Sequence, residues 1–188
     1  MNYQEYFLPF QPLGQESIDL LLSRCVERKY KKGEIITAEG SIQRELLFVE
    51  EGVQMSYFNN DGKMHVIGFT YAPSISGIPD SFLFQRPSKY TLQALTGSRF
   101  QAISFERLQQ LFDEAPVIER LFRKIGEAIL AGLIDRHLEL QAYTIEQRFR
   151  LFAQRSPHLF QLVPHKYIAN YLRIDPTNFS KLYNSVRI

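Results

Sequence analysis

The spacing of apolar residues changes twice along the chain and divides it into three stretches. Apolar side chains recur at helical spacing in residues 14–26, which predicts a short N-terminal helix. Between residues 35 and 105, short β-branched or aromatic runs alternate with turn signals, which predicts an antiparallel barrel or roll. Asp61-Gly62 lies between two alternating runs and predicts a hairpin, because glycine supplies the positive φ of such turns. The predicted strands are residues 34–37, 46–50, 54–58, 64–71, 90–94 and 99–104.

Helical spacing returns after the predicted strands. Residues 105–112 form one predicted helix, and Pro116 opens a long helical stretch over residues 117–143. Its apolar stripe, with steps of three and four, suits a seam between two copies of the helix. The alternative is a helix that packs on its own domain; we favour the dimer seam because two glycines interrupt the stretch and indicate close packing. The candidate seam residues are Ile118, Phe122, Ile125, Ile129 and Leu133.

A domain boundary is expected after the long helix. Thr144 and Gln147 have the spacing of a capping box, and the helix that they open should stop at Ser156-Pro157. The charge balance changes at the same place: residues 1–115 contain 11 Lys/Arg and 14 Asp/Glu, whereas residues 144–188 contain 7 and 2. A basic C-terminal unit suits a polyanionic partner, and a solvated basic surface is the alternative.

Two helix starts follow each other closely within residues 163–188. Pro164 can open the first helix, and Asp175 with Pro176 provides a cap and a first residue for the second. Arg173-Ile174 makes a tight connection between them, with Ile174 apolar enough to fill the core. Two short helices, a brief turn and a polar outer face predict a helix-turn-helix, with an ordinary helical hairpin as the alternative.

The polar face of the second helix has the chemistry of a DNA reader. A recognition helix enters the major groove with its N-terminal residues nearest the bases. Asparagine can pair with adenine and lysine with guanine acceptors, while groups near helix starts bind phosphate. The candidate DNA-binding residues are Thr177, Asn178, Lys181, Asn184, His165, Lys166 and Arg173.

The single cysteine, Cys25, limits the chemistry of the chain. It excludes a disulfide framework within one chain and a site of several thiolates on zinc or iron–sulfur. Because Cys25 follows an apolar run at helical spacing, a buried structural thiol in a reducing cytoplasm is expected. The first residues lack the pattern of a secretory leader, and no apolar run reaches the length of a membrane span.

No enzyme chemistry is expected from the sequence. A cupin-like metal enzyme would require clustered ligands on barrel strands, but only His65 of the four histidines lies in the strand region. Glycine-rich phosphate loops, nucleophile elbows and paired catalytic motifs are missing from the sequence. We therefore expect no catalytic residue, no metal site and no cofactor. A ligand-binding or protein-interaction module without DNA binding stays open as the main alternative function.

Several motifs together resemble the Crp/Fnr superfamily of bacterial transcription regulators over nearly the whole chain. They are Lys32-Gly33-Glu34, Glu50-Glu51-Gly52, Ile103-Ser104-Phe105-Glu106-Arg107-Leu108, and Ile168-Ala169-Asn170-Tyr171-Leu172 with Asp175-Pro176-Thr177. The resemblance implies an α+β fold: an antiparallel β-roll (a double-stranded β-helix, jelly-roll-like) in residues 1–115, a dimerisation helix in 116–143 and a helix-turn-helix (winged-helix-like) unit in 144–188. It also implies a homodimer that binds near-palindromic double-stranded DNA and responds to a small effector, with RNA polymerase as a further candidate partner.

The effector site departs from the pattern of the family. Members that bind cyclic nucleotides carry a Gly-Glu pair, followed about ten residues later by Arg with Ser or Thr. Gly77 is present here, but Ile78 stands where the glutamate would be, and Ser88 falls near the arginine position, between Arg86 and Lys89. Cyclic AMP is therefore not expected as the ligand, because burying its phosphate without a paired cation is costly. These five residues are the candidate effector pocket, although ordinary surface cations in a loop are the favoured interpretation of Arg86 and Lys89.

The turn between the last two helices also differs from the family, which usually has glycine there. This chain has Arg173, and a non-glycine residue is strained in the left-handed conformation. The sequence therefore predicts a turn of different geometry.

Overall fold

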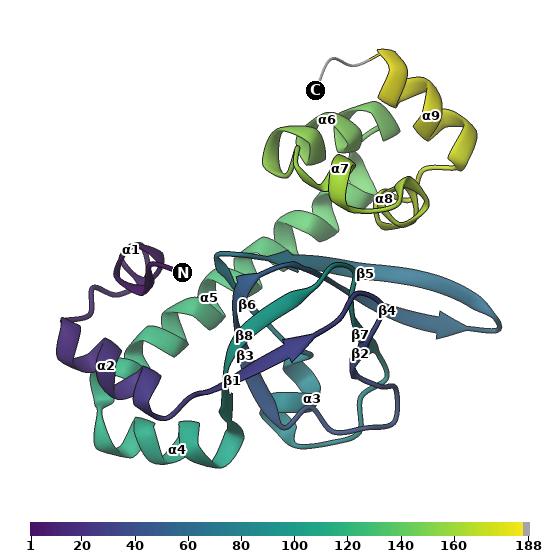
Figure 1. Cartoon of the computed structure of the whole chain (residues 1–188). Coiled ribbons are helices and arrows are strands. Elements are labelled where there is room, and N and C mark those ends of the chain that lie inside the picture. The colour runs from purple at the N-terminus through teal and green to yellow at the C-terminus, as the bar shows by residue number, and fades with distance from the viewer. Residues whose placement is uncertain (186–188) are drawn as a thin grey trace.

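Two four-stranded antiparallel sheets form the β-rich part of the molecule (Figure 1). The computed structural model describes residues 1–185. One sheet has the order β1-β8-β3-β6 and the other β2-β7-β4-β5, an arrangement like a jelly roll. Apolar residues of both sheets meet in a core that includes Leu47, Leu92 and Phe100. The strands are β1 (Val26–Tyr30), β2 (Ile35–Thr37), β3 (Glu45–Glu51), β4 (Val53–Asn60), β5 (Lys63–Tyr71), β6 (Ser74–Ser76), β7 (Thr91–Ala94) and β8 (Ser98–Ser104).

The six strands predicted from the sequence are all present, and two more were missed. The β4–β5 hairpin is confirmed: Asn60 pairs with Lys63, and Asp61 and Gly62 have φ of 48° and 76°. The missed strands are β1 and β6, the two edges of their sheet. The middle of β1 is exposed on both faces, so it lacks the alternation that marks a strand, and β6 has only three residues.

Helices cover the outer face of the sheet β1-β8-β3-β6. They are α1 (Tyr3–Phe7), α2 (Gln15–Ser23), α4 (Phe105–Glu114) and the first half of α5 (Pro116–Ala142), and they share a core with Phe48 and Ile103. Helix α2 was predicted to run to residue 26, but it ends at Ser23 because Val26 begins β1. Helices α1 and α3 (Pro79–Phe84) are short and were not predicted.

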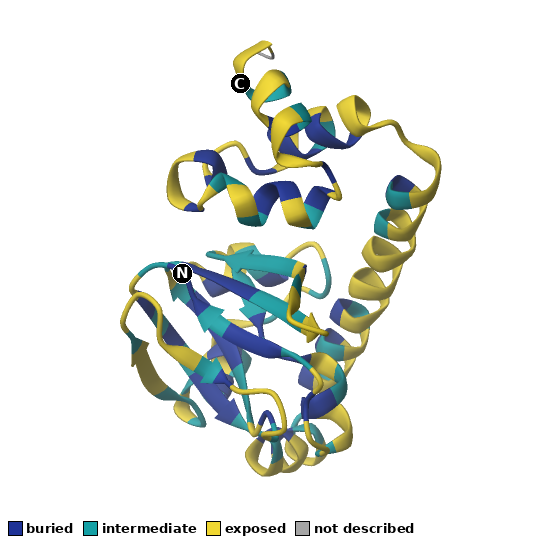
Figure 2. Cartoon of the chain, turned by 90° about the vertical axis from the view of Figure 1, so that its right-hand side faces the viewer, coloured by how far each residue is buried: buried dark blue, intermediate teal, exposed yellow. Residues whose placement is uncertain are grey.

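The long helix α5 has two different halves. Its bounds agree with the predicted stretch, but Ile118 and Ile125 are buried in the core formed with α2 and α4. The prediction that these two residues line a dimer seam is therefore wrong, because their own domain already covers them. Phe122 is half-buried, and Figure 2 shows that the second half of α5 is mostly exposed. Its large exposed apolar side chains are Ile129, Leu130, Leu133, Ile134 and Leu138.

Four helices make up the C-terminal part of the described chain: α6 (Ile145–Arg155), α7 (Leu159–Leu162), α8 (His165–Leu172) and α9 (Pro176–Ser185). The capping box is confirmed: Thr144 accepts a hydrogen bond from the Gln147 amide, and the Gln147 side chain accepts one from the Thr144 amide. Residues 105–185 contain no strand, so the wing implied by a winged-helix-like unit is not found there. None of the described helices combines the length and apolarity needed to cross a membrane.

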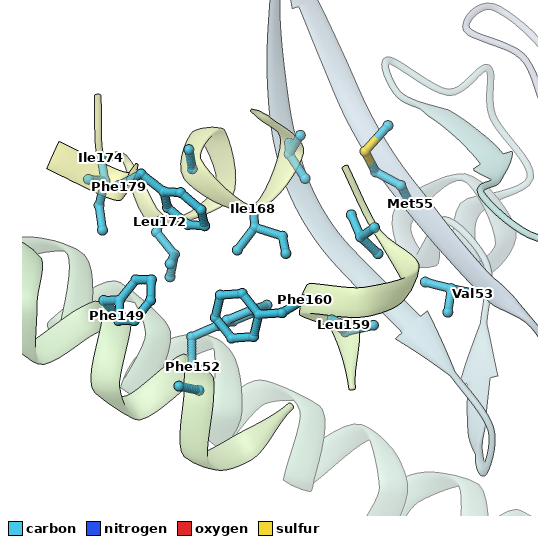
Figure 3. Packing of buried hydrophobic residues seen from close by; sticks show 14 of the residues in the cluster. Val53, Met55, Phe149, Phe152, Leu159, Phe160, Ile168, Leu172, Ile174 and Phe179 are labelled. Atoms are coloured by element: carbon cyan, nitrogen blue, oxygen red, sulfur yellow. The ribbon is translucent and has the colours of Figure 1, made fainter. Parts of the chain in front are cut away.

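The C-terminal helices pack on the sheet β2-β7-β4-β5 through one shared core. Figure 3 shows Phe149, Phe152 and Phe160 gathered with Ile168 and Leu172. The same cluster contains residues of the sheet, namely Val53, Met55, Val66 and Leu95. The C-terminal helices therefore do not form a separate core of their own in this structure.

Candidate nucleic-acid interface

Helices α8 and α9 are joined by a turn of three residues, Arg173 to Asp175. Arg173 has φ of 53° and ψ of 47°, which is the left-handed conformation. Its amide donates to the Asn170 carbonyl and the Ile174 amide to the Ala169 carbonyl, at 3.0 and 2.9 Å. Arg148 Nη2 lies 3.4 Å from the Arg173 carbonyl oxygen and supports the turn from α6. The prediction of a different turn is therefore wrong: arginine adopts the conformation that glycine would, and surrounding hydrogen bonds offset the strain.

Two predicted features of the turn are confirmed. Ile174 is buried and belongs to the core that the C-terminal helices share with the sheet β2-β7-β4-β5. Asp175 caps α9, since its Oδ1 accepts a hydrogen bond from the Asn178 amide at 3.0 Å. This bond, with further help from the Asn178 side-chain amide, holds the pKa of the Asp175 carboxyl below its usual value. The carboxylate therefore stays charged at the positive end of the helix dipole.

The outer face of α9 is polar and accessible. Thr177, Lys181 and Asn184 are exposed, and their spacing of four and three places them on one side of the helix. The opposite side carries Phe179, which is buried in the core. Asn178 is half-buried and its Nδ2 donates to Asp175 Oδ2, so this side chain is held inside the cap. The structure thus places three of the four predicted α9 residues outward and uses the fourth within the turn.

The residues predicted at the start of α8 differ from each other. His165 Nε2 lies 3.2 Å from the Phe160 carbonyl oxygen, and its ring centroid lies 4.3 Å from that of Tyr183. His165 is therefore half-buried against these aromatic residues, and its role as a phosphate contact stays a prediction. Lys166 is exposed, with its Nζ 4.9 Å from the centre of the Tyr167 ring. Arg173 is exposed at the turn.

A buried ion-pair group supports the turn from α5, and the sequence analysis missed it. Glu139 is 8% exposed and accepts hydrogen bonds from Arg136 Nη1 at 2.9 Å and Arg155 Nη1 at 3.1 Å. Burial opposes ionisation of Glu139, but the two guanidinium groups outweigh it and hold its pKa below the usual value. Arg136 also donates to the Tyr171 carbonyl and lies over its ring at 4.1 Å. Arg136 and Glu139 are three residues apart on α5, but Arg155 and Tyr171 belong to α6 and α8, so helical periodicity within α5 does not identify the whole group.

The candidate effector residues do not converge. Gly77 and Ile78 line a groove of about 460 Å³ between α3, α4 and α5, whereas Ser88, Arg86 and Lys89 lie outside it. Ser88 is buried, and its hydroxyl donates to the Tyr90 carbonyl at 2.8 Å. Arg86 and Lys89 are exposed, and Arg86 pairs with Asp80 at 3.4 Å. The prediction of one pocket is therefore wrong, because the loop after α3 turns back to pair with residues 40–42.

The roll interior does not fit a cyclic nucleotide. Ile78 is 2% exposed and packs among the apolar residues that fill the roll, including Leu92 and Phe100. A cyclic phosphate held there would lack the two candidate cations, because Arg86 and Lys89 are exposed. In residues 1–185, no three His, Cys, Asp or Glu side chains gather in a way that could hold a metal ion.

Comparison with known proteins supports the first part of the fold. Residues 27–115 match the family model of the cyclic nucleotide-binding domain. The matched segment includes all eight strands except the first residue of β1, and it ends just before α5. No curated protein sequence matches the chain significantly.

Solved regulators have a similar fold over most of the chain. The catabolite activator protein of Thermus thermophilus is 18% identical, with a TM-score of 0.61, over 94% of this chain and 84% of that one. FixK2 from Bradyrhizobium japonicum is 17% identical, with a TM-score of 0.72, over 85% and 83%. The c-di-GMP responsive regulator CLP of Xanthomonas campestris is 19% identical, with a TM-score of 0.67, over 91% and 90%. At these identities the similarity establishes the fold.

Proposed function

We propose that this chain is a dimeric, DNA-binding transcription regulator of the Crp/Fnr type that acts in the cytoplasm. The observation that carries the proposal is the outer face of α9, where Thr177, Lys181 and Asn184 are exposed beside a capped helix start. A helix presented in this way has the features of a recognition helix for the major groove. Lysine and asparagine there supply donors and acceptors for base edges.

The three stretches of the chain have separate proposed roles. Residues 1–115 form the effector domain, 116–143 the dimerisation helix and 144–188 the helix-turn-helix unit, of which the last three residues lie outside the described structure. The exposed side chains Ile129 and Leu133 of α5 support the dimer, because an apolar helix face in water favours association. In the dimer, two copies of α9 would read successive major grooves of a near-palindromic site.

The proposed effector is not cyclic AMP. Its phosphate would need a buried cation, and Arg86 and Lys89 are exposed outside the roll core. A different signal that shifts the roll against α5 would change the spacing of the two α9 helices. RNA polymerase is a further proposed partner.

A selection of bound sequences from random double-stranded DNA, with and without cell extract, tests the proposal. We expect enrichment of a near-palindromic site with two half-sites. If an effector acts, the cell extract should change the amount of DNA that is bound. Binding to that site should weaken with salt, and Lys181→Ala should weaken it by about tenfold, the cost of one base contact. Lys89→Ala removes an exposed lysine of the roll and is the matched control, with unchanged binding. Failure to enrich any sequence, or binding that is equally tight at high salt, would favour a protein-interaction module instead.

A further inference from the structure

A side-chain amide on α8 binds the backbone of the roll at two points. Asn170 Oδ1 accepts a hydrogen bond from the Val66 amide at 2.7 Å, and Asn170 Nδ2 donates one to the Met64 carbonyl at 2.8 Å. Both partners belong to β5, more than 100 residues earlier in the chain. Asn170 is exposed, whereas its neighbours Ile168 and Ala169 are buried in the shared apolar core.

The position of β5 explains why such a contact can form. It is the outer strand of the sheet β2-β7-β4-β5, so its far side presents backbone groups that no strand pairs. In an antiparallel ladder, residues two apart direct these groups to the same side, as Met64 and Val66 do. A primary amide carries one acceptor and donors like a peptide group. Asn170 therefore takes the place of a neighbouring strand for one residue pair.

A second anchor lies at the other end of β5. The hydroxyl of Tyr71, the last residue of the strand, lies 2.5 Å from Ser156 Oγ, just after α6. Between the anchors, the Phe69 ring packs against Tyr171 with centroids 5.4 Å apart. The C-terminal helices are thus held along the length of β5 by two polar contacts and an aromatic one.

The docking leaves the proposed DNA surface open. Thr177 and Lys181 remain exposed while α8 is docked on β5. The contact can therefore fix the orientation of α9 relative to the roll and α5 without covering it. We propose that Asn170 is a positioning residue that fixes this orientation, and the DNA part of this inference rests on the proposed function.

Hydrogen exchange measured by NMR tests the docking directly. Val66 N–H should be protected in the wild-type chain and should exchange at least about tenfold faster in Asn170→Ala, because one hydrogen bond and its neighbour are lost. His65 should keep its protection, since its backbone groups face β4. Asn170→Asp keeps an acceptor for Val66 but sets an oxygen against the Met64 carbonyl, so it should behave like Asn170→Ala. Gln161→Ala, an exposed polar residue on α7, is the matched control.

A DNA readout separates positioning from simple stability. The selected site is compared with versions whose half-sites are moved apart by one or two base pairs. A fixed orientation of α9 should give the wild-type chain a strong preference for one spacing, and Asn170→Ala should reduce that preference by about fivefold, because the binding-competent orientation is less populated. The double variant Asn170→Ala, Tyr71→Phe removes both polar anchors and should reduce the spacing preference further. Its circular dichroism spectrum and cooperative thermal unfolding should be retained, which shows that the chain is still folded.

The outcomes are distinguishable. Unchanged exchange at Val66 in Asn170→Ala would overturn the docking contact. Faster exchange with an unchanged spacing preference would overturn the positioning role. Absence of DNA binding by the wild-type chain, with the exchange result as expected, would overturn the proposed function and with it the DNA part of this inference, but not the docking.

Discussion

Glu139 near the end of α5 and Arg155 at the end of α6 form an ion pair, with Oε1 and Nη1 3.1 Å apart. Arg136 binds the other oxygen of the same carboxylate and the backbone of α8. The buried carboxylate thus links α5 to α6, and Arg136 links this group to α8. This arrangement makes the C-terminal helices dependent on the charge of a residue outside them.

Glu139→Gln should therefore destabilise the chain. We expect a loss of about 1–3 kcal/mol in the free energy of unfolding at neutral pH, since a charged hydrogen-bond acceptor is removed from two guanidinium groups. The folded-state pKa of Glu139 is lowered, so its contribution to stability is present above the ordinary carboxyl range and is lost as the pH falls through that lowered value. The difference between variant and wild type, measured by urea unfolding, should shrink below about pH 4.

The exposed pair Glu146–Arg150 on α6 provides the control. Glu146→Gln should cost less than about 0.5 kcal/mol, as exposed pairs four residues apart on a helix do. If Glu139→Gln and Glu146→Gln lowered the free energy of unfolding equally, the buried Glu139 ion pairs would contribute no more than an exposed pair.

Arg173→Gly should stabilise the fold. The left-handed conformation at φ of 53° is strained for arginine and not for glycine. A gain of about 0.5–1 kcal/mol in the free energy of unfolding is expected, once the greater flexibility of the unfolded glycine chain is subtracted. Arg173→Ala keeps the strained conformation and should not raise the free energy of unfolding. A gain of the same size in Arg173→Ala would show that the loss of the charge, and not the relief of strain, stabilises the chain.

Leu133→Glu should weaken self-association. Leu133 is 60% exposed in the single chain, and a charge in an apolar helix seam is costly. Sedimentation equilibrium should show at least about a tenfold rise in the dimer dissociation constant, which corresponds to 1.4 kcal/mol. Leu162→Glu alters a comparably exposed leucine on α7 and should leave association unchanged. A wild-type chain that is monomeric at all concentrations would contradict the dimer.

Cys25 should be unreactive in the folded chain. Burial raises the pKa of its thiol to about 12, so very little thiolate exists at pH 8. Alkylation by iodoacetamide should be slow in buffer and fast in concentrated urea. Rapid alkylation of the folded chain would contradict a structural thiol.

Local patterns predicted the elements whose signals lie within a few residues. The β4–β5 hairpin follows from Asp61-Gly62, and the α6 start follows from Thr144 with Gln147. Edge strand β1 was missed because neither of its faces is fully buried. The outward position of Thr177 and Lys181 on α9 followed from helical periodicity and the buried Phe179.

The errors at the candidate sites have a common cause. His165 was predicted at the surface, but it is half-buried, because Phe160 and Tyr183 from two other helices pack beside its ring. Ile118 and Ile125 were assigned to a dimer, but α2 and α4 cover them. In each case the deciding neighbour lies on another element, which a periodic pattern does not identify.

The sequence by itself determined where the longer helices and the six alternating strands begin, which faces are apolar and where the charge balance changes, because caps, turns and periodicity act over a few residues. Only the tertiary structure decided that Asn170 binds the edge of β5, that Glu139 pairs with Arg155 of α6 and that Arg136 binds the backbone of α8. These contacts join groups that are distant in the chain, and their free energy depends on distance and desolvation, which exist only after folding.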